Sequence, residues 1–190
     1  MYNITGEGGA ALADPAMASM PVPANDATDV LRDELNETVS LVQERGVGAA
    51  AEIGDVTKAE VVEHLVEAAT EKFGQLDIMV NNAGFCRDKT IFGMSDDEFD
   101  SVVRVHLRGH FVNMRNVTAY WRDKAKSDGT APYGRIVSTA SESYLFGQPG
   151  QPNYAAAKAG IIAMAMGAAQ LLSKYGISSN VIMPRALTDM

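Results

Sequence analysis

Three residues in the second half of the chain, Ser141, Tyr154 and Lys158, have the types and spacing needed to move a proton to or from an alcohol. Tyr154 and Lys158 are four residues apart in a segment with a helical pattern, so their side chains share one face. A free tyrosine titrates near pH ~10, but a nearby ammonium favours the phenolate and lowers that value. Such a tyrosine can give a proton to a carbonyl oxygen or take one from an alcohol. Ser141 ends the preceding predicted strand, and its hydroxyl could stabilise charge on the same oxygen.

The segments that must position these residues alternate between strand and helix patterns. The predicted helices cover 28–45, 57–73, 95–126 and 151–175, with Thr28 as a cap and capping-box sequences at 57–60 and 95–98. The predicted strands cover 48–56, 77–84, 134–141 and 178–184, and residues 2–5 could end another strand. This alternation predicts a single α/β domain of the Rossmann-like, doubly wound type. Its sheet is parallel, with helices on both faces.

In a sheet of this kind, ligands bind outside the carboxyl ends of the strands. Polar or turn-forming residues follow four predicted strands at those ends: Asp55, the NNAG sequence at 81–84, Ser141 and Pro184. We therefore expect these residues to meet at one edge of the sheet. On its own, the Tyr154–Lys158 pair would also fit an ordinary surface pair on a helix.

The joint pattern of NNAG at 81–84, GRIVSTAS at 134–141 and GQPNYAAAKAG at 150–160 resembles the short-chain dehydrogenase/reductase family. The resemblance covers roughly residue 28 to the end, so residues 1–27 form an irregular N-terminal segment and 28–190 the domain. It implies an enzyme that transfers hydride between NAD or NADP and a secondary alcohol or ketone. It also implies that Tyr154 is the acid/base, that Lys158 lowers its pKa and binds the nicotinamide ribose, and that Ser141 orients the substrate carbonyl.

The same resemblance assigns the cofactor contacts. Asp55 and Val56 resemble the family's adenine-contacting pair, although Asp55 could instead be a turn or cap residue before Thr57. A close backbone approach explains the glycine of the NNAG turn. The candidate cofactor-binding residues are Asp55, Val56, Asn82, Ala83, Gly84, Tyr154, Lys158, Pro184 and Thr188. NAD is slightly preferred over NADP, because no arginine or lysine that could meet a 2′-phosphate precedes Arg32.

His106 stands where the family usually has an asparagine that supports a proton-relay water. Its surroundings, VHLRG and NNAGFCRDKTIF, resemble the hydroxyacyl-CoA dehydrogenase branch of the family and related actinobacterial reductases. The resemblance implies that His106 is a fourth catalytic residue, holding the relay in place of asparagine; a purely structural histidine is the alternative. A metal site is not expected, since no carboxylate cluster shares the spacing of the histidines.

The N-terminus departs further from the family pattern, which opens with a strand, a TGxxxGxG loop and a helix that hold the cofactor pyrophosphate. Only Thr5-Gly6-Glu7-Gly8-Gly9 is found here, with the wrong glycine spacing. We therefore expect a domain that lacks the first strand–helix unit and the C-terminal end. The alternative function is a truncated remnant that binds no dinucleotide and is inactive, or serves only as an oligomerisation partner.

Composition limits the remaining possibilities. A net charge of −8 argues against nucleic acid or an anionic membrane as the main partner. The single cysteine excludes an internal disulfide and indicates a reducing compartment, the cytoplasm by default. No membrane-spanning stretch and no secretory signal are expected. The helix at 151–174 is apolar nearly all round, which predicts burial on more than one face and a homodimer or homotetramer through it and the 96–126 helix. Candidate substrates are hydroxyacyl thioesters, steroids or small cyclic alcohols.

Overall fold

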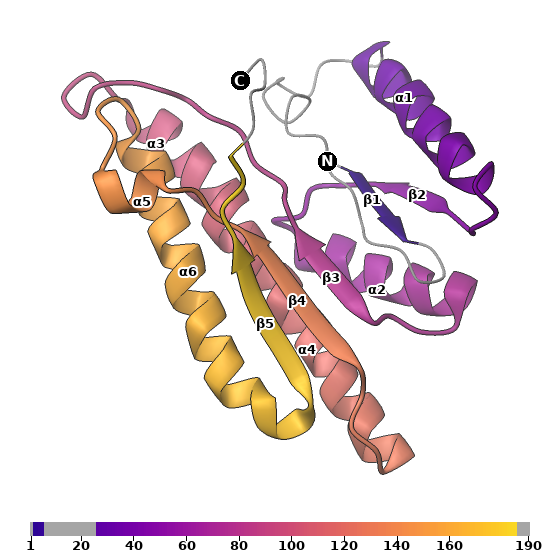
Figure 1. The fold of residues 1–190 in the computed structure, drawn as a ribbon. Helices are drawn as coiled ribbons and strands as arrows, with labels where there is room; N and C mark the ends of the chain where they lie inside the picture. Colours follow the sequence, from indigo (N-terminus) through magenta and orange to yellow (C-terminus); the bar gives the residue numbers. More distant parts are fainter. Residues whose placement is uncertain (1, 6–25, 186–190) are drawn as a thin grey trace.

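The computed structural model describes residues 2–5 and 26–185 and has the predicted alternation of strands and helices (Figure 1). The strands are β1 (Tyr2–Thr5), β2 (Ala50–Ile53), β3 (Ile78–Asn81), β4 (Gly134–Thr139) and β5 (Ile177–Ile182). The helices are α1 (Asp26–Gln43), α2 (Ala59–Phe73), α3 (Asp96–Val103), α4 (Gly109–Asp128), α5 (Ser143–Phe146) and α6 (Pro152–Leu172), with a π-helix η2 (Arg104–Arg108) and a 3₁₀ helix η3 (Ser173–Tyr175). The α/β fold class predicted from the sequence is confirmed.

The core of the molecule lies between the parallel sheet β3–β4–β5 and the helices behind it. Trp121 of α4 is fully buried there, and its indole N–H donates to the Leu76 carbonyl at 2.6 Å. Strand β4 begins with Gly134, where an added Cβ would lie 2.9 Å from both Trp121 and Ile177. The glycine therefore lets the largest core side chain reach the sheet.

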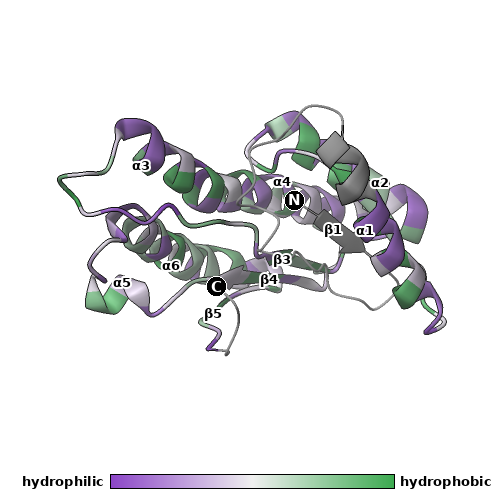
Figure 2. Ribbon diagram, turned by 90° about the horizontal axis from the view of Figure 1, so that it is seen from above, coloured by the Kyte–Doolittle hydropathy of each residue, from purple (hydrophilic) through white to green (hydrophobic). Residues whose placement is uncertain are grey.

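Helices α2, α4 and α6 form one layer on a single face of the β3–β4–β5 sheet (Figure 2). Among the described residues, these three helices are the ones that pack on this sheet. On the other face, where Figure 2 shows no described helix, Ser178, Asn180 and Ile182 of β5 are exposed. Successive right-handed crossovers that step in one direction, β3 to β4 to β5, place their helices on the same side.

Strand β1 pairs antiparallel with β2, with Tyr2 opposite Ile53, in a separate two-stranded sheet. The expectation of one wholly parallel sheet is wrong at this end of the chain. Alternation of strands and helices does not by itself fix strand direction, and antiparallel pairing is slightly more stable per residue for so short a pair. Helix α1 begins at Asp26, so Thr28 lies inside the helix and does not cap it.

One of the two predicted capping boxes is present. Ser95 and Glu98 cap α3 reciprocally: the Glu98 N–H donates to the Ser95 hydroxyl, and the Ser95 N–H donates to the Glu98 carboxylate. The box predicted to begin at Thr57 is wrong, because α2 starts at Ala59 and has no side-chain cap. Thr57 is instead buried, with its N–H bonded to the side chain of Asp55.

The segment Pro152–Tyr175 is, by length and composition alone, long and apolar enough to cross a membrane, although no such stretch was expected. Its buried side, including Ile161 and Ala165, belongs to the protein core, but only 28% of its most apolar window is buried. Met166 and Leu171 are 58% and 60% exposed. Burial on a second face was expected for this helix, but within a single chain that face is exposed.

Candidate active site

The carboxyl ends of β3, β4 and β5 lie at one edge of the parallel sheet, as predicted. The 82–84 turn follows β3, Ser141 lies two residues beyond β4, and Pro184 lies two residues beyond β5. The sheet thus brings together three of the four positions that sequence analysis placed at strand ends.

Tyr154, in the first turn of α6, is the centre of this group. It is half-buried, and its ring centre lies 5.3 Å from Lys158 Nζ and 5.1 Å from the ring of His106, edge to face. Burial raises the pKa of Tyr154, and the nearby Ser141 hydroxyl offsets part of that rise. The Ser141 hydroxyl itself donates to Ser143 Oγ at 3.1 Å. All four candidate catalytic side chains therefore converge on one point.

The charge balance at Tyr154 differs from the expectation. Burial raises the pKa of Tyr154, and neighbouring Cys86 adds to the rise, so the phenol is protonated at neutral pH. Lys158 Nζ donates to the Thr139 carbonyl at 2.7 Å, and this bond holds the ammonium 5.3 Å from the centre of the Tyr154 ring. Burial also lowers the pKa of Lys158 to about 8.

His106 is buried in the π-helix η2, with 2% of its surface exposed. Its Nε2 lies 3.0 Å from the backbone nitrogen and 2.8 Å from the carbonyl oxygen of Phe85. Burial, together with the Lys158 charge, lowers the pKa of His106 to about 3, so the ring is neutral. Its Nδ1 is buried without a hydrogen-bond partner among the described residues.

Asp55 and Val56 have local structural roles. The exposed Asp55 accepts a hydrogen bond from the Thr57 N–H at 2.9 Å, which is the turn role named as its alternative. Val56 is buried against α4, where a Cβ added to Gly109 would lie 3.0 Å from it. The contact of these two residues with an adenine remains a prediction.

The described residues fit one end of a nicotinamide dinucleotide. The Lys158 ammonium is buried at the strand ends and forms no ion pair within the described part of the chain, and the 82–84 turn beside it ends in the buried Gly84. An ammonium beside a phenol is a pair of groups suited to the hydroxyls of a ribose. Pro184 is exposed beyond β5, whereas Thr188 and the glycines at 6–9 lie outside the described residues.

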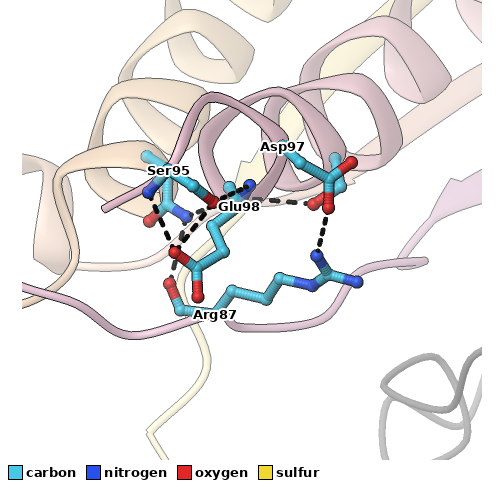
Figure 3. Close-up of polar contacts among 6 residues, drawn as sticks. Arg87, Ser95, Asp97 and Glu98 are labelled. Carbon is cyan, nitrogen blue, oxygen red and sulfur yellow. Dashed lines mark hydrogen bonds and ion pairs between the residues drawn. The ribbon is translucent and has the colours of Figure 1, made fainter. Parts of the chain in front are cut away.

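A buried asparagine that sequence analysis did not consider ties Tyr154 to the loop after β3. Asn153 is fully buried; its Nδ2 donates to the carbonyls of Arg87, at 3.1 Å, and Glu98, at 3.0 Å, and its Oδ1 accepts the Tyr154 N–H at 2.7 Å. Figure 3 shows the loop end that it holds, where Arg87 pairs with Asp97 at 2.8 Å. The only signal in the sequence was an asparagine at the start of a predicted helix.

We expect Asn153→Ala to lower the free energy of unfolding by about 1–3 kcal/mol, because the substitution removes a fully buried side chain together with its hydrogen bonds to the Arg87 and Glu98 carbonyls. Urea unfolding followed by circular dichroism measures the change. Asn180→Ala, on exposed β5, is the control and should stay within about 0.5 kcal/mol. Equal effects of the two substitutions would contradict the anchoring role of Asn153.

Similarity to known proteins extends over most of the chain. The family model for short chain dehydrogenases matches residues 16–190. The chain is 49% identical over 168 residues to a hydroxyacyl-CoA dehydrogenase, ChsB1, of Mycobacterium tuberculosis, covering 88% of this chain and 51% of that protein. It is 33% identical over 172 residues to a peroxisomal hydratase-dehydrogenase-epimerase of Neurospora crassa, covering 89% of this chain and 18% of that protein.

A solved structure is also similar. A short chain dehydrogenase from Mycobacterium avium superposes with a TM-score of 0.76 at 41% sequence identity, covering 80% of this chain and 54% of that one. The chain thus spans about half the length of the Mycobacterium tuberculosis relative and of this structure.

Proposed function

This chain belongs to the short-chain dehydrogenase family. On that premise we propose that it carries the active-site part of an oxidoreductase that interconverts a hydroxyacyl thioester and the corresponding ketoacyl thioester. The observation that carries the proposal is the convergence of Ser141 and Lys158 on Tyr154 at the strand ends. Relatives named hydroxyacyl-CoA dehydrogenase and hydratase-dehydrogenase-epimerase favour a thioester over a steroid or a small cyclic alcohol.

The side chains at this site can handle the proton of the reaction. A bound NAD or NADP supplies or accepts the hydride. In reduction, Tyr154 gives its phenolic proton to the substrate carbonyl oxygen while Ser141 donates a hydrogen bond to that oxygen. The Lys158 ammonium then stabilises the phenolate that is left. Tyr154 is protonated at neutral pH, so the proton that reduction consumes is present on its phenol.

The cofactor contacts belong to the same proposal. Lys158 and Tyr154 would hold the nicotinamide ribose, and the family pattern assigns the other contacts to Asp55, Val56, Asn82, Ala83, Gly84, Pro184 and Thr188. We favour NAD over NADP, because no basic residue precedes Arg32.

We also propose that the enzyme is a cytoplasmic homodimer or homotetramer, assembled through the 96–126 and 151–174 helices. Phe111 of α4 and Met166 and Leu171 of α6 are 45%, 58% and 60% exposed in the single chain. Apolar side chains this exposed on neighbouring helices would be covered by a second copy.

The experiment is a fluorescence titration of the purified chain with NADH and NADPH, followed by reduction of acetoacetyl-coenzyme A. We expect saturable binding and turnover that Lys158→Met abolishes. Lys174→Met is the matched control, because Lys174 Nζ also lies 5.0 Å from a tyrosine ring, away from the site. Absence of saturable binding to both dinucleotides would overturn the proposal and favour the inactive remnant.

A further inference from the structure

We infer that Ser143 is a positioning residue whose hydroxyl holds the Ser141 side chain and directs its proton. The inference deepens the proposed function and rests on it for the role of Ser141 as the donor to the substrate oxygen. The contacts between the two serines come from the fold and do not depend on that function.

Ser143 is the first residue of α5 and lies two residues after Ser141. It is 6% exposed, and α5 packs against α6, the helix that carries Tyr154 (Figure 1). The Ser141 Oγ atom donates to Ser143 Oγ at 3.1 Å and accepts the Ser143 N–H at 3.3 Å. Two polar groups of one buried residue therefore contact the Ser141 hydroxyl.

The direction of the bond between the two serines is set further along, at Gln151. Its Nε2 atom lies 2.9 Å from a carboxylate oxygen of Asp88, and a carboxylate has no proton to donate. The amide nitrogen of Gln151 therefore faces Asp88, and its Oε1 atom lies 3.5 Å from Ser143 Oγ. Gln148 Oε1 lies 3.3 Å from the same hydroxyl. Because an amide oxygen only accepts, the Ser143 proton points toward the glutamines, and the Ser143 oxygen accepts from Ser141.

The Ser141 proton is therefore engaged by Ser143. A hydroxyl has one proton, so Ser141 must release this bond before it donates to a substrate carbonyl oxygen. The exchange has a small cost, because the contacts of Ser143 with Gln148 and Gln151 are long for bonds between oxygens and hence weak. When the Ser143 hydroxyl turns from the glutamines to the Ser141 oxygen, it donates there beside its own N–H. Two accepted bonds polarise the Ser141 O–H and strengthen the bond that it gives to the substrate.

Ser143→Ala isolates the hydroxyl, because it keeps the backbone N–H that Ser141 accepts. We expect kcat for acetoacetyl-coenzyme A reduction to fall about 5-fold, the usual effect of one lost hydrogen bond, with KM changed less than about 2-fold. Ser173→Ala is the matched control and should leave kcat unchanged. The Ser173 hydroxyl also donates at 3.1 Å, to the Gln170 carbonyl, and is exposed beyond the far end of α6.

A double-mutant cycle tests whether Ser143 acts through Ser141. In a Ser141→Ala background, measured in single turnovers, we expect Ser143→Ala to lower the rate less than about 1.5-fold, because the hydroxyl that it directs is gone. A full loss of about 5-fold in that background would overturn the inference, since Ser143 would then act on the substrate or on the fold directly. An unchanged kcat in Ser143→Ala alone would overturn it as well.

NMR reads the same arrangement without turnover. The Hα–Hβ couplings of Ser141 report whether its side chain stays in one staggered rotamer. We expect one rotamer in the unsubstituted chain and in Ser173→Ala, and averaging between rotamers in Ser143→Ala, where the bond to the second hydroxyl is lost. Couplings that stay unchanged in Ser143→Ala would contradict the inference. If the unsubstituted chain turns over no thioester, the couplings still decide whether Ser143 holds Ser141, and the proposed function alone fails.

Discussion

Tyr154→Phe is expected to lower kcat for acetoacetyl-coenzyme A reduction by at least about 10²-fold, the usual contribution of a positioned general acid. The substitution removes the proton that Tyr154 would give to the substrate oxygen and leaves the ring packed against His106. Dinucleotide affinity should fall far less than kcat, because Lys158 remains to hold the nicotinamide ribose when the phenol hydroxyl is lost. Steady-state kinetics and the NADH titration measure the two effects separately.

Tyr133→Phe is the matched control for this experiment. Tyr133 is 59% exposed, and its ring stacks on the Arg135 guanidinium, with the Arg135 Cζ atom 3.9 Å from the ring centre. Loss of its hydroxyl should leave kcat unchanged. Substantial residual turnover in Tyr154→Phe, above about a tenth of the unsubstituted rate, would mean that another group supplies the proton.

Gly84→Ala is expected to lower stability and turnover together, with a loss of about 1–3 kcal/mol in the free energy of unfolding. The new methyl group would lie 1.8 Å from His106 Cε1 and 2.5 Å from its Nδ1, so the imidazole must move. Moving the ring breaks its contact with Phe85 and its edge-to-face contact with Tyr154. Turnover should therefore fall together with stability.

Gly167→Ala gives the matched control, since an added Cβ at this α6 position meets nothing within 4 Å. A glycine inside a helix costs roughly 0.5–1 kcal/mol relative to alanine, so this variant should be as stable as the unsubstituted chain or slightly more stable. Urea unfolding of the two variants measures the difference. If Gly84→Ala is as stable as Gly167→Ala, the His106 imidazole can move away from residue 84 without loss of free energy of unfolding, which contradicts the prediction.

Local patterns in the sequence were enough to predict the helices and strands and part of the candidate site. The four-residue spacing of Tyr154 and Lys158 placed them on one helix face, and the Ser95–Glu98 capping box fixed the start of α3. The failed capping box at Thr57 has a physical reason, since Asp55 engages the Thr57 N–H before the helix begins. A local pattern is reliable where no nearby side chain offers the backbone another partner.

The sequence by itself determined the alternation of strands and helices, the residues at the strand ends and the family, because each depends on short-range periodicity or on a contiguous motif. Only the tertiary structure decided the helical layer on one face, the antiparallel direction of β1, and the contacts of Asn153 and His106. Asn153 bonds a carbonyl 66 residues away, and His106 bonds a backbone group 21 residues away. Such partners meet only after the chain has folded, so their geometry cannot be inferred from the spacing of either residue.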